Sequence, residues 1–153
     1  MLETPHVVVG AAIASKIANP VLAIPLALGS HFLLEKIPHW NPHLNKETEK
    51  YGKPTQKSTI IAAVDATVAF TLGLFISSLV LPDKVHALTI VGACLASSAP
   101  DIIEGPYFFL GLRNKLLKKW IDFQKSIQVD SEFLPGLLTQ AITVLAAFWW
   151  ILG

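Results

Sequence analysis

The sequence predicts an all-α membrane protein that folds as a single helical domain over residues 1–153. Hydrophobic residues make up 52% of the 153 residues and charged residues only 15%, and the mean hydropathy is +0.53. Ordinary soluble domains carry about 25% charged residues. Several apolar stretches approach the length that crosses a bilayer. An all-helical soluble protein is the less favoured alternative, and extraction without detergent would reveal it.

The first apolar stretch, from Val7 to Leu34, is expected to form a broken helical hairpin. Asn19-Pro20 interrupts it, because proline removes a backbone donor and disfavours helix in the residue before it. We therefore expect two arms, at about 7–18 and 20–36, which are roughly 18 and 25 Å long. The first arm is short for a hydrocarbon core of about 30 Å, so a hairpin fits better than one long span.

About three further apolar helices follow. The stretch 58–81 is the best candidate for a membrane span, with Ser58 as a possible cap and Pro82 after its end. A shorter stretch, 85–99, ends at Pro100-Asp101. The last stretch, 134–152, carries aromatic residues at its end, which is typical of an interfacial anchor.

The basic residues predict the orientation. Segments 36–57 and 104–133 each carry five lysines or arginines, whereas the short connection 82–84 carries one. Two crossings separate the basic segments, so both fall on one side, which the positive-inside rule makes cytoplasmic in a bacterial inner (plasma) membrane. Residues 113–125 are expected to form one amphipathic interfacial helix on anionic lipid. The alternative is a surface helix that covers a soluble core.

Five ionisable residues lie at or near helix ends that this topology brings to the cytoplasmic face. Such residues cost about 2.5–3.5 kcal/mol each on insertion scales and usually mark function. Glu35 follows His31 by four residues, so both share a helix face. Glu104 can face the same way as Asp101. The five residues are His6, His31, Glu35, Asp65 and Asp101.

Imidazole and carboxylate groups are the ligands of a catalytic metal, most simply Zn, with Mn or Fe as alternatives. We expect metal ligands among His6, His31, Asp65 and Asp101, with His39 as a further candidate. Each residue has a simpler interpretation, as a helix-end residue, an interfacial anchor or a member of a hydrogen-bonded pair. His86 begins its helix at the opposite face and is excluded.

Two glutamates are the candidate catalytic residues. Glu35 and Glu104 can each serve as a ligand, as a group that orients a ligand, or as a general base. Two metal ions are conceivable with this many carboxylates. The single cysteine, Cys94, lies in an apolar run and is expected to be a small buried residue.

Short motifs resemble those of small bacterial inner-membrane metal-dependent hydrolases named for a LexA-binding member. They are Thr4-Pro5-His6, the run from Ser30 to Trp40, and Pro100-Asp101. The group is more distantly similar to zinc-dependent phospholipase C and P1 nuclease, which are helical and bind metal through His and Asp. The resemblance implies that His6 matches the N-terminal histidine of the family. It also implies that His31 with Glu35 matches a Ser-His-x-x-x-Asp element.

Asp101 then matches the first acid of the family's Leu-Pro-Asp-x-Asp element. The chain departs from the family where Ile103 replaces the second acid and Glu104 follows it. The family's His-Arg-Gly-x-Thr-His-Ser block is absent, and Gln124 and Lys125 stand where histidines are expected. An incomplete ligand set therefore remains open.

The function favoured by these residues is metal-dependent hydrolysis of phosphoesters or lipids inside a membrane. Membrane lipid and a small or lipid phosphoester are the expected partners, and no nucleic acid is expected. The alternative is a non-catalytic membrane protein with a structural or degenerate polar site. A small transporter is a weaker possibility, because the chain has no inverted repeat.

Overall fold

The computed structural model describes residues 1–153 and is all-helical, which confirms the predicted fold class. The eight helices are α1 (Glu3–Lys16), α2 (Pro20–Leu34), α3 (Leu44–Tyr51), α4 (Gln56–Ser78), α5 (Lys84–Ile102), α6 (Gly105–Phe109), α7 (Lys115–Ile127) and α8 (Phe133–Leu152).

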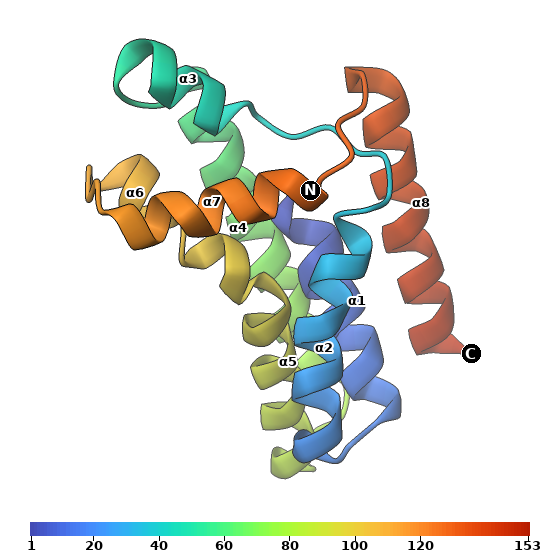
Figure 1. Cartoon of the computed structure of the whole chain (residues 1–153). Coiled ribbons are helices and arrows are strands. Elements are labelled where there is room, and N and C mark those ends of the chain that lie inside the picture. Colours follow the sequence, from blue (N-terminus) through green and yellow to red (C-terminus); the bar gives the residue numbers. More distant parts are fainter.

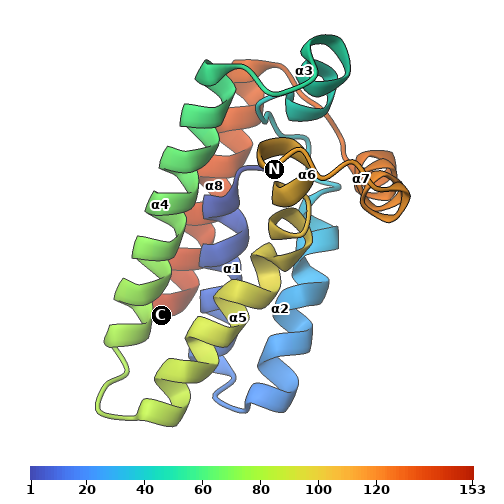
Figure 2. The ribbon, with the colours of Figure 1, turned by 90° about the vertical axis from the view of Figure 1, so that its left-hand side faces the viewer.

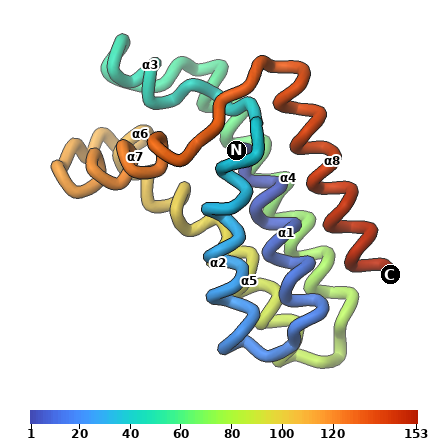
Figure 3. Tube along the Cα trace, turned by 45° about the vertical axis from the view of Figure 1, so that its right-hand side comes forward, coloured from blue at the N-terminus to red at the C-terminus, as the bar shows by residue number.

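The long helices run roughly along one axis, and the short helices lie at one end of them (Figure 1). Helices α1 and α2 form the expected hairpin, and α4 and α5 form a second one beside it (Figure 2). The turns of both hairpins lie at the end opposite α3, α6 and α7, and the N-terminus lies near α7 (Figure 3). Both lysine-rich segments are therefore at the same end of the bundle.

Helices α4, α5 and α8 are each long and apolar enough to cross a membrane. Only 17% of the most apolar window of α4, and of α8, is buried inside the molecule. Most of their apolar side chains therefore face outward, where hydrocarbon can cover them. Helix α7 crosses the bundle axis at a steep angle (Figure 1), the orientation expected of an interfacial helix.

Several helix ends differ from the sequence-based expectation. Helix α5 continues through Pro100 to Ile102, one turn beyond the predicted end. Helix α1 begins at Glu3 rather than near residue 7. The short helices α3 and α6 were not predicted, because they have little apolar periodicity of their own.

The core is built largely from small side chains of α1, α2 and α5, including Ala11, Ala27 and Ala93. Small residues let helix backbones approach closely in membrane proteins. A Cβ on Gly10 would lie 2.5 Å from Ser97 Oγ and 2.8 Å from the Ala93 carbonyl oxygen. Only glycine fits there, and this close approach holds α1 and α5 together one turn from His6.

Candidate metal centre

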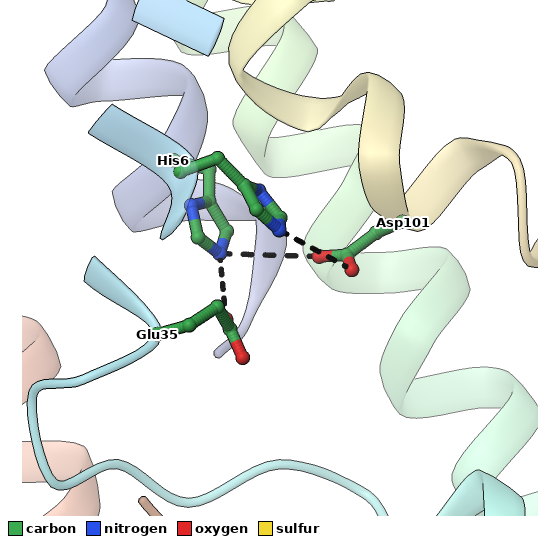
Figure 4. A group of neighbouring side chains, drawn as sticks. His6, Glu35 and Asp101 are labelled. Carbon is green, nitrogen blue, oxygen red and sulfur yellow. Dashed lines mark hydrogen bonds and ion pairs between the residues drawn. The ribbon is translucent and has the colours of Figure 1, made fainter. Parts of the chain in front are cut away.

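Three helices bring four potential ligands together at the end of the bundle that carries α7. His6 comes from α1, Asp101 from α5, and His31 and Glu35 from the end of α2. One ligand atom from each of the four lies within 4.8 Å of the others. Figure 4 shows His6, Glu35 and Asp101 pointing toward one another. The two histidines and Glu35 are fully buried, whereas the side chain of Asp101 is 21% exposed, so the cluster is accessible from the Asp101 side.

The atomic separations suit a single small cation. His6 Nε2 lies 3.1 Å from Glu35 Oε1 and 3.9 Å from Asp101 Oδ2. His31 Nε2 lies 3.8 Å from Asp101 Oδ1. A tetrahedral ion with bonds of about 2.1 Å would place its ligand atoms about 3.4 Å apart. The observed separations bracket this value, so small side-chain movements would complete a coordination shell.

The His31 ring is held in the orientation that a metal ligand needs. Its Nδ1 donates a hydrogen bond of 2.8 Å to the Ser97 carbonyl oxygen. That bond leaves Nε2 as the lone-pair atom, and Nε2 faces Asp101. Metal-binding histidines are commonly oriented by a carbonyl in this way. The His6 ring stacks on His31, with ring centroids 4.1 Å apart.

Several buried polar atoms in and beside the cluster have no hydrogen-bond partner. Among them are His31 Nε2, Glu35 Oε2 and His39 Nε2. A buried polar group without a partner costs free energy, so native proteins rarely leave one unpaired. A cation bound by the group of four would be a partner for His31 and Glu35, two of these residues.

His39 lies beside the cluster, as the sequence suggested. Its Nδ1 donates to the Ile37 carbonyl oxygen at 2.7 Å, and its Nε2 lies 3.7 Å from Glu35 Oε2. Burial lowers the pKa of His39, so the ring is neutral near pH 7 and Nε2 is an acceptor. His39 Nε2 therefore faces Glu35 Oε2, which is also an acceptor. His39 is outside the group of four that could hold one ion.

Backbone pairing holds the segment that carries Glu35 and His39. The Val129 amide donates to the Glu35 carbonyl, and the His39 amide donates to the Val129 carbonyl, each at 3.1 Å. The Ser131 amide donates to the His39 carbonyl at 2.9 Å. The loop after α2 is thus fixed by the linker between α7 and α8.

Asp101 and Glu104 form the wall of the cluster next to α7. Gln124 Nε2 donates a hydrogen bond of 3.0 Å to Asp101 Oδ1. Burial, together with the charges of Asp101 and Glu35, raises the pKa of Glu104 to about 8. Glu104 therefore carries a proton at neutral pH, and its Oε1 is buried without a partner.

The sequence predicted Asp65 as a metal ligand, but in the structure its side chain lies at the start of helix α1. Its carboxylate accepts hydrogen bonds from the backbone amides of Glu3 and Thr4 and, at 2.6 Å, from the Thr4 hydroxyl. Asp65 is therefore the cap of α1, whose own N-cap residue, Leu2, has no side chain able to accept a bond. It is not one of the four clustered residues. The prediction overlooked this task because helix α1 begins earlier than expected.

Three residues near the cluster were not found as site residues from the sequence. Gln124 lies four residues after Trp120 on the apolar face of α7, and a polar residue on that face was a usable signal. Glu3 has a buried oxygen without a partner. The Met1 amino group contacts Glu35 Oε1. Nothing in the sequence pattern marked Glu3 or Met1.

Comparisons with family models, curated proteins and solved structures find no match to this chain. The resemblance of its short motifs to inner-membrane hydrolases therefore stays a prediction. The class of protein that the fold and site define is a helical bundle with candidate membrane spans and a cluster of His6, His31, Glu35 and Asp101 that can hold a metal ion.

Proposed function

We propose that the protein is a membrane-embedded, metal-dependent hydrolase that cleaves phosphoesters. The observation that carries the proposal is the group of four potential ligands, two of which, His31 and Glu35, keep a buried Nε2 and a buried Oε2 without a hydrogen-bond partner. Zn, or Mn or Fe, fits a mixed imidazole and carboxylate ligand set. The resemblance of the short sequence motifs to metal-dependent hydrolases adds support of a weaker kind.

A divalent metal bound here would supply a water of lowered pKa and would polarise a phosphoryl oxygen. In this proposal His6, His31, Glu35 and Asp101 hold the ion, and His39 lies beside Glu35 without being one of the four ligands. Glu35 thus takes the ligand role among the roles that the sequence left open. Gln124 and the Ser97 carbonyl orient Asp101 and His31 respectively.

Glu104 is the proton-transfer residue of the proposal. In the absence of an ion, burial and the charges of Asp101 and Glu35 raise the pKa of Glu104 to about 8. A cation at the cluster would offset those charges, and the buried carboxyl, when protonated, could donate its proton to a leaving oxygen. The general-base role considered for Glu104 is less suited to that protonation state. The protein as a whole lies in a bacterial inner membrane with the cluster at the cytoplasmic side, as the basic segments 36–57 and 104–133 at that end favour.

The test is metal analysis of the purified full chain, joined to hydrolysis of bis(p-nitrophenyl) phosphate in detergent. We expect Zn, Mn or Fe at about one equivalent or more per chain and a metal-dependent rate. Asp101→Asn, which keeps the side-chain shape, should abolish both. Protein that is folded but free of metal, even after incubation with each of the three ions, would overturn the proposal.

A structural role is the second candidate, and one observation favours it. The His6–Glu35 and Gln124–Asp101 contacts already join α1, α2, α5 and α7 without an ion. Interhelical polar contacts in membranes average below about 1 kcal/mol, so such a network should tolerate single substitutions. Full retention of fold and cellular function in Asp101→Asn and His31→Ala would favour this role over hydrolysis.

A further inference from the structure

A cavity of about 590 Å³ lies against the cluster, between α4 on one side and the end of α5 with α6 on the other. Asp101 is part of its wall, so the cavity reaches a proposed metal ligand. Its volume falls within the range of about 300–1,000 Å³ that holds small ligands. Helices α4 and α5 diverge from their connecting turn toward this end (Figure 2), which makes room for it.

Two facing parts of the cavity wall are apolar, and polar residues line the remainder. Ala62, Ala63 and Ala66 give α4 a smooth face toward the cavity, and Phe108 and Phe109 line the opposite wall. Such walls suit a hydrocarbon chain and offer few hydrogen-bonding groups to a polar substrate.

The cavity is continuous with the outer apolar surface of the bundle. Its lining residues Ala63, Ile102 and Phe109 are exposed. On the same helix as the alanines, Ile60 and Val64 are exposed on the outward face. A chain that lies in the surrounding hydrocarbon can therefore pass between α4 and α6 without crossing water.

The outer rim of the cavity is basic, whereas its inner wall is acidic. Lys46 and Lys125 lie at the rim, and Lys125 pairs with Asp130. The exposed side chain of Lys46 makes no ion pair, although its charge, like that of Lys125, lowers the pKa of Asp130. Two lysines against one aspartate leave the rim with an excess positive charge. An anionic headgroup could then lie between Lys46 and a metal ion at Asp101, where the ion would offset the charges of the carboxylates that hold it.

We propose that this cavity binds the hydrocarbon chain of an anionic membrane lipid and presents the lipid headgroup to the cluster. The inference rests on the proposed hydrolase function and names its substrate class. The apolar part of the cavity selects for the length of the lipid's hydrocarbon chain, and Lys46 and the metal select for the charge of its headgroup. A soluble phosphoester with no chain would be bound only at the polar end.

The test uses lysophosphatidic acid that carries a diazirine near the end of its acyl chain, with the full chain in phosphatidylcholine nanodiscs. After illumination, labelled peptides are mapped by mass spectrometry. We expect labels on residues 59–66 and 105–109 above those on the outward faces of α4 and α8. A diazirine lysophosphatidylcholine serves as the uncharged comparison and should label the cavity less.

Matched substitutions sharpen the experiment. Ala66→Trp fills the cavity and should reduce cavity labelling about tenfold or more, because it removes the apolar surface that holds the chain. Ala146→Trp places the same residue on the exposed side of α8 and should change nothing. Ala62→Leu is a smaller obstruction for use if Ala66→Trp fails to fold. Lys46→Gln should remove the preference for the anionic lipid while chain labelling persists.

Metal content is measured on the same samples, which separates the two proposals. Labels spread over the outer faces, or labels insensitive to both cavity variants, overturn the lipid site even when metal is bound. Equal labelling by the anionic and uncharged lipids overturns the headgroup assignment. Cavity labelling in a protein that binds no metal would leave the chain site standing and would overturn the hydrolase.

Discussion

Each end of the bundle carries a histidine, His86 in the first turn of α5 and His31 in the last turn of α2. The two side chains have different hydrogen-bonding surroundings. At the far end, His86 Nε2 donates to the Ala14 carbonyl at 2.9 Å, and the neighbouring Asp83 caps α5. At the other end, His31 Nε2 is buried without a partner and faces a carboxylate. Both histidines donate one ring N–H to a carbonyl, His31 to Ser97 and His86 to Ala14. What distinguishes His31 is its second nitrogen, which is buried without a partner and faces a carboxylate.

The largest expected effect comes from exchanging these two histidines for alanine in turn. His31→Ala should lower metal affinity by more than about 100-fold, because it removes a ligand rather than the residue that orients one. His86→Ala should leave affinity unchanged. Competition with a fluorescent zinc chelator measures both. Equal losses in the two variants would remove the distinction between the ends.

A smaller effect is expected at the hydrogen bond that orients Asp101. Gln124→Leu should lower metal affinity by about 10–100-fold, as for other residues that hold a ligand in place. Gln140→Leu is the control, because Gln140 is also buried but bonds to Leu2 and Trp40 instead. An unchanged affinity in Gln124→Leu would show that Asp101 needs no support from α7.

The pH dependence of stability tests Glu104 in metal-free protein. Its folded-state pKa is about 8 against 4.5 for the free group, so the folded state binds the extra proton between these values. Glu104 should therefore lower stability as pH rises through this window, by at most about 1.4 kcal/mol per pH unit. Burial also raises the pKa of Glu3, which adds a slope of the same sign, so Glu104→Gln should reduce the slope without removing it. Thermal unfolding in detergent from pH 5 to 8 measures the change, and an equal slope with and without Glu104→Gln would contradict the assignment.

The smallest expected effect separates Asp65 from Asp101. Asp65→Ala removes the cap of α1 and should lower the free energy of unfolding by about 1 kcal/mol. Its metal affinity should stay close to that of the unchanged protein, because Asp65 is outside the cluster. Metal loss as severe as in Asp101→Asn would place Asp65 in the coordination shell after all.

Apolar stretch length and proline position were enough to predict the hairpin of α1 and α2 and the helices α4, α5 and α8. The shared end of His6, His31, Glu35 and Asp101 followed from that topology alone. The role of Asp65 did not, because it depends on which amides begin α1 and on α4 lying beside them; Glu3 and Pro5 are typical of a first helical turn but do not specify the partner. Whether a carboxylate caps a helix or faces a histidine depends on separations of a few ångströms, which periodicity does not specify.

The same limit applies to Gln124 and His39. Gln124 reaches Asp101 only because α7 folds back across the bundle end (Figure 1). His39 was a candidate from its residue type, but its position depends on pairing with residues 129–131, ninety positions along the chain. Contacts between segments so distant cannot be read from local pattern.

The linker before α8 supports the cluster with its main chain alone. The amides of Val129 and Ser131 hold the stretch that carries Glu35 and His39, while their side chains take no part in those bonds. These hydrogen bonds therefore do not depend on which side chain stands at either position, provided that the backbone amide is kept. Proline at either position would delete the amide hydrogen and release a histidine that lies ninety residues upstream.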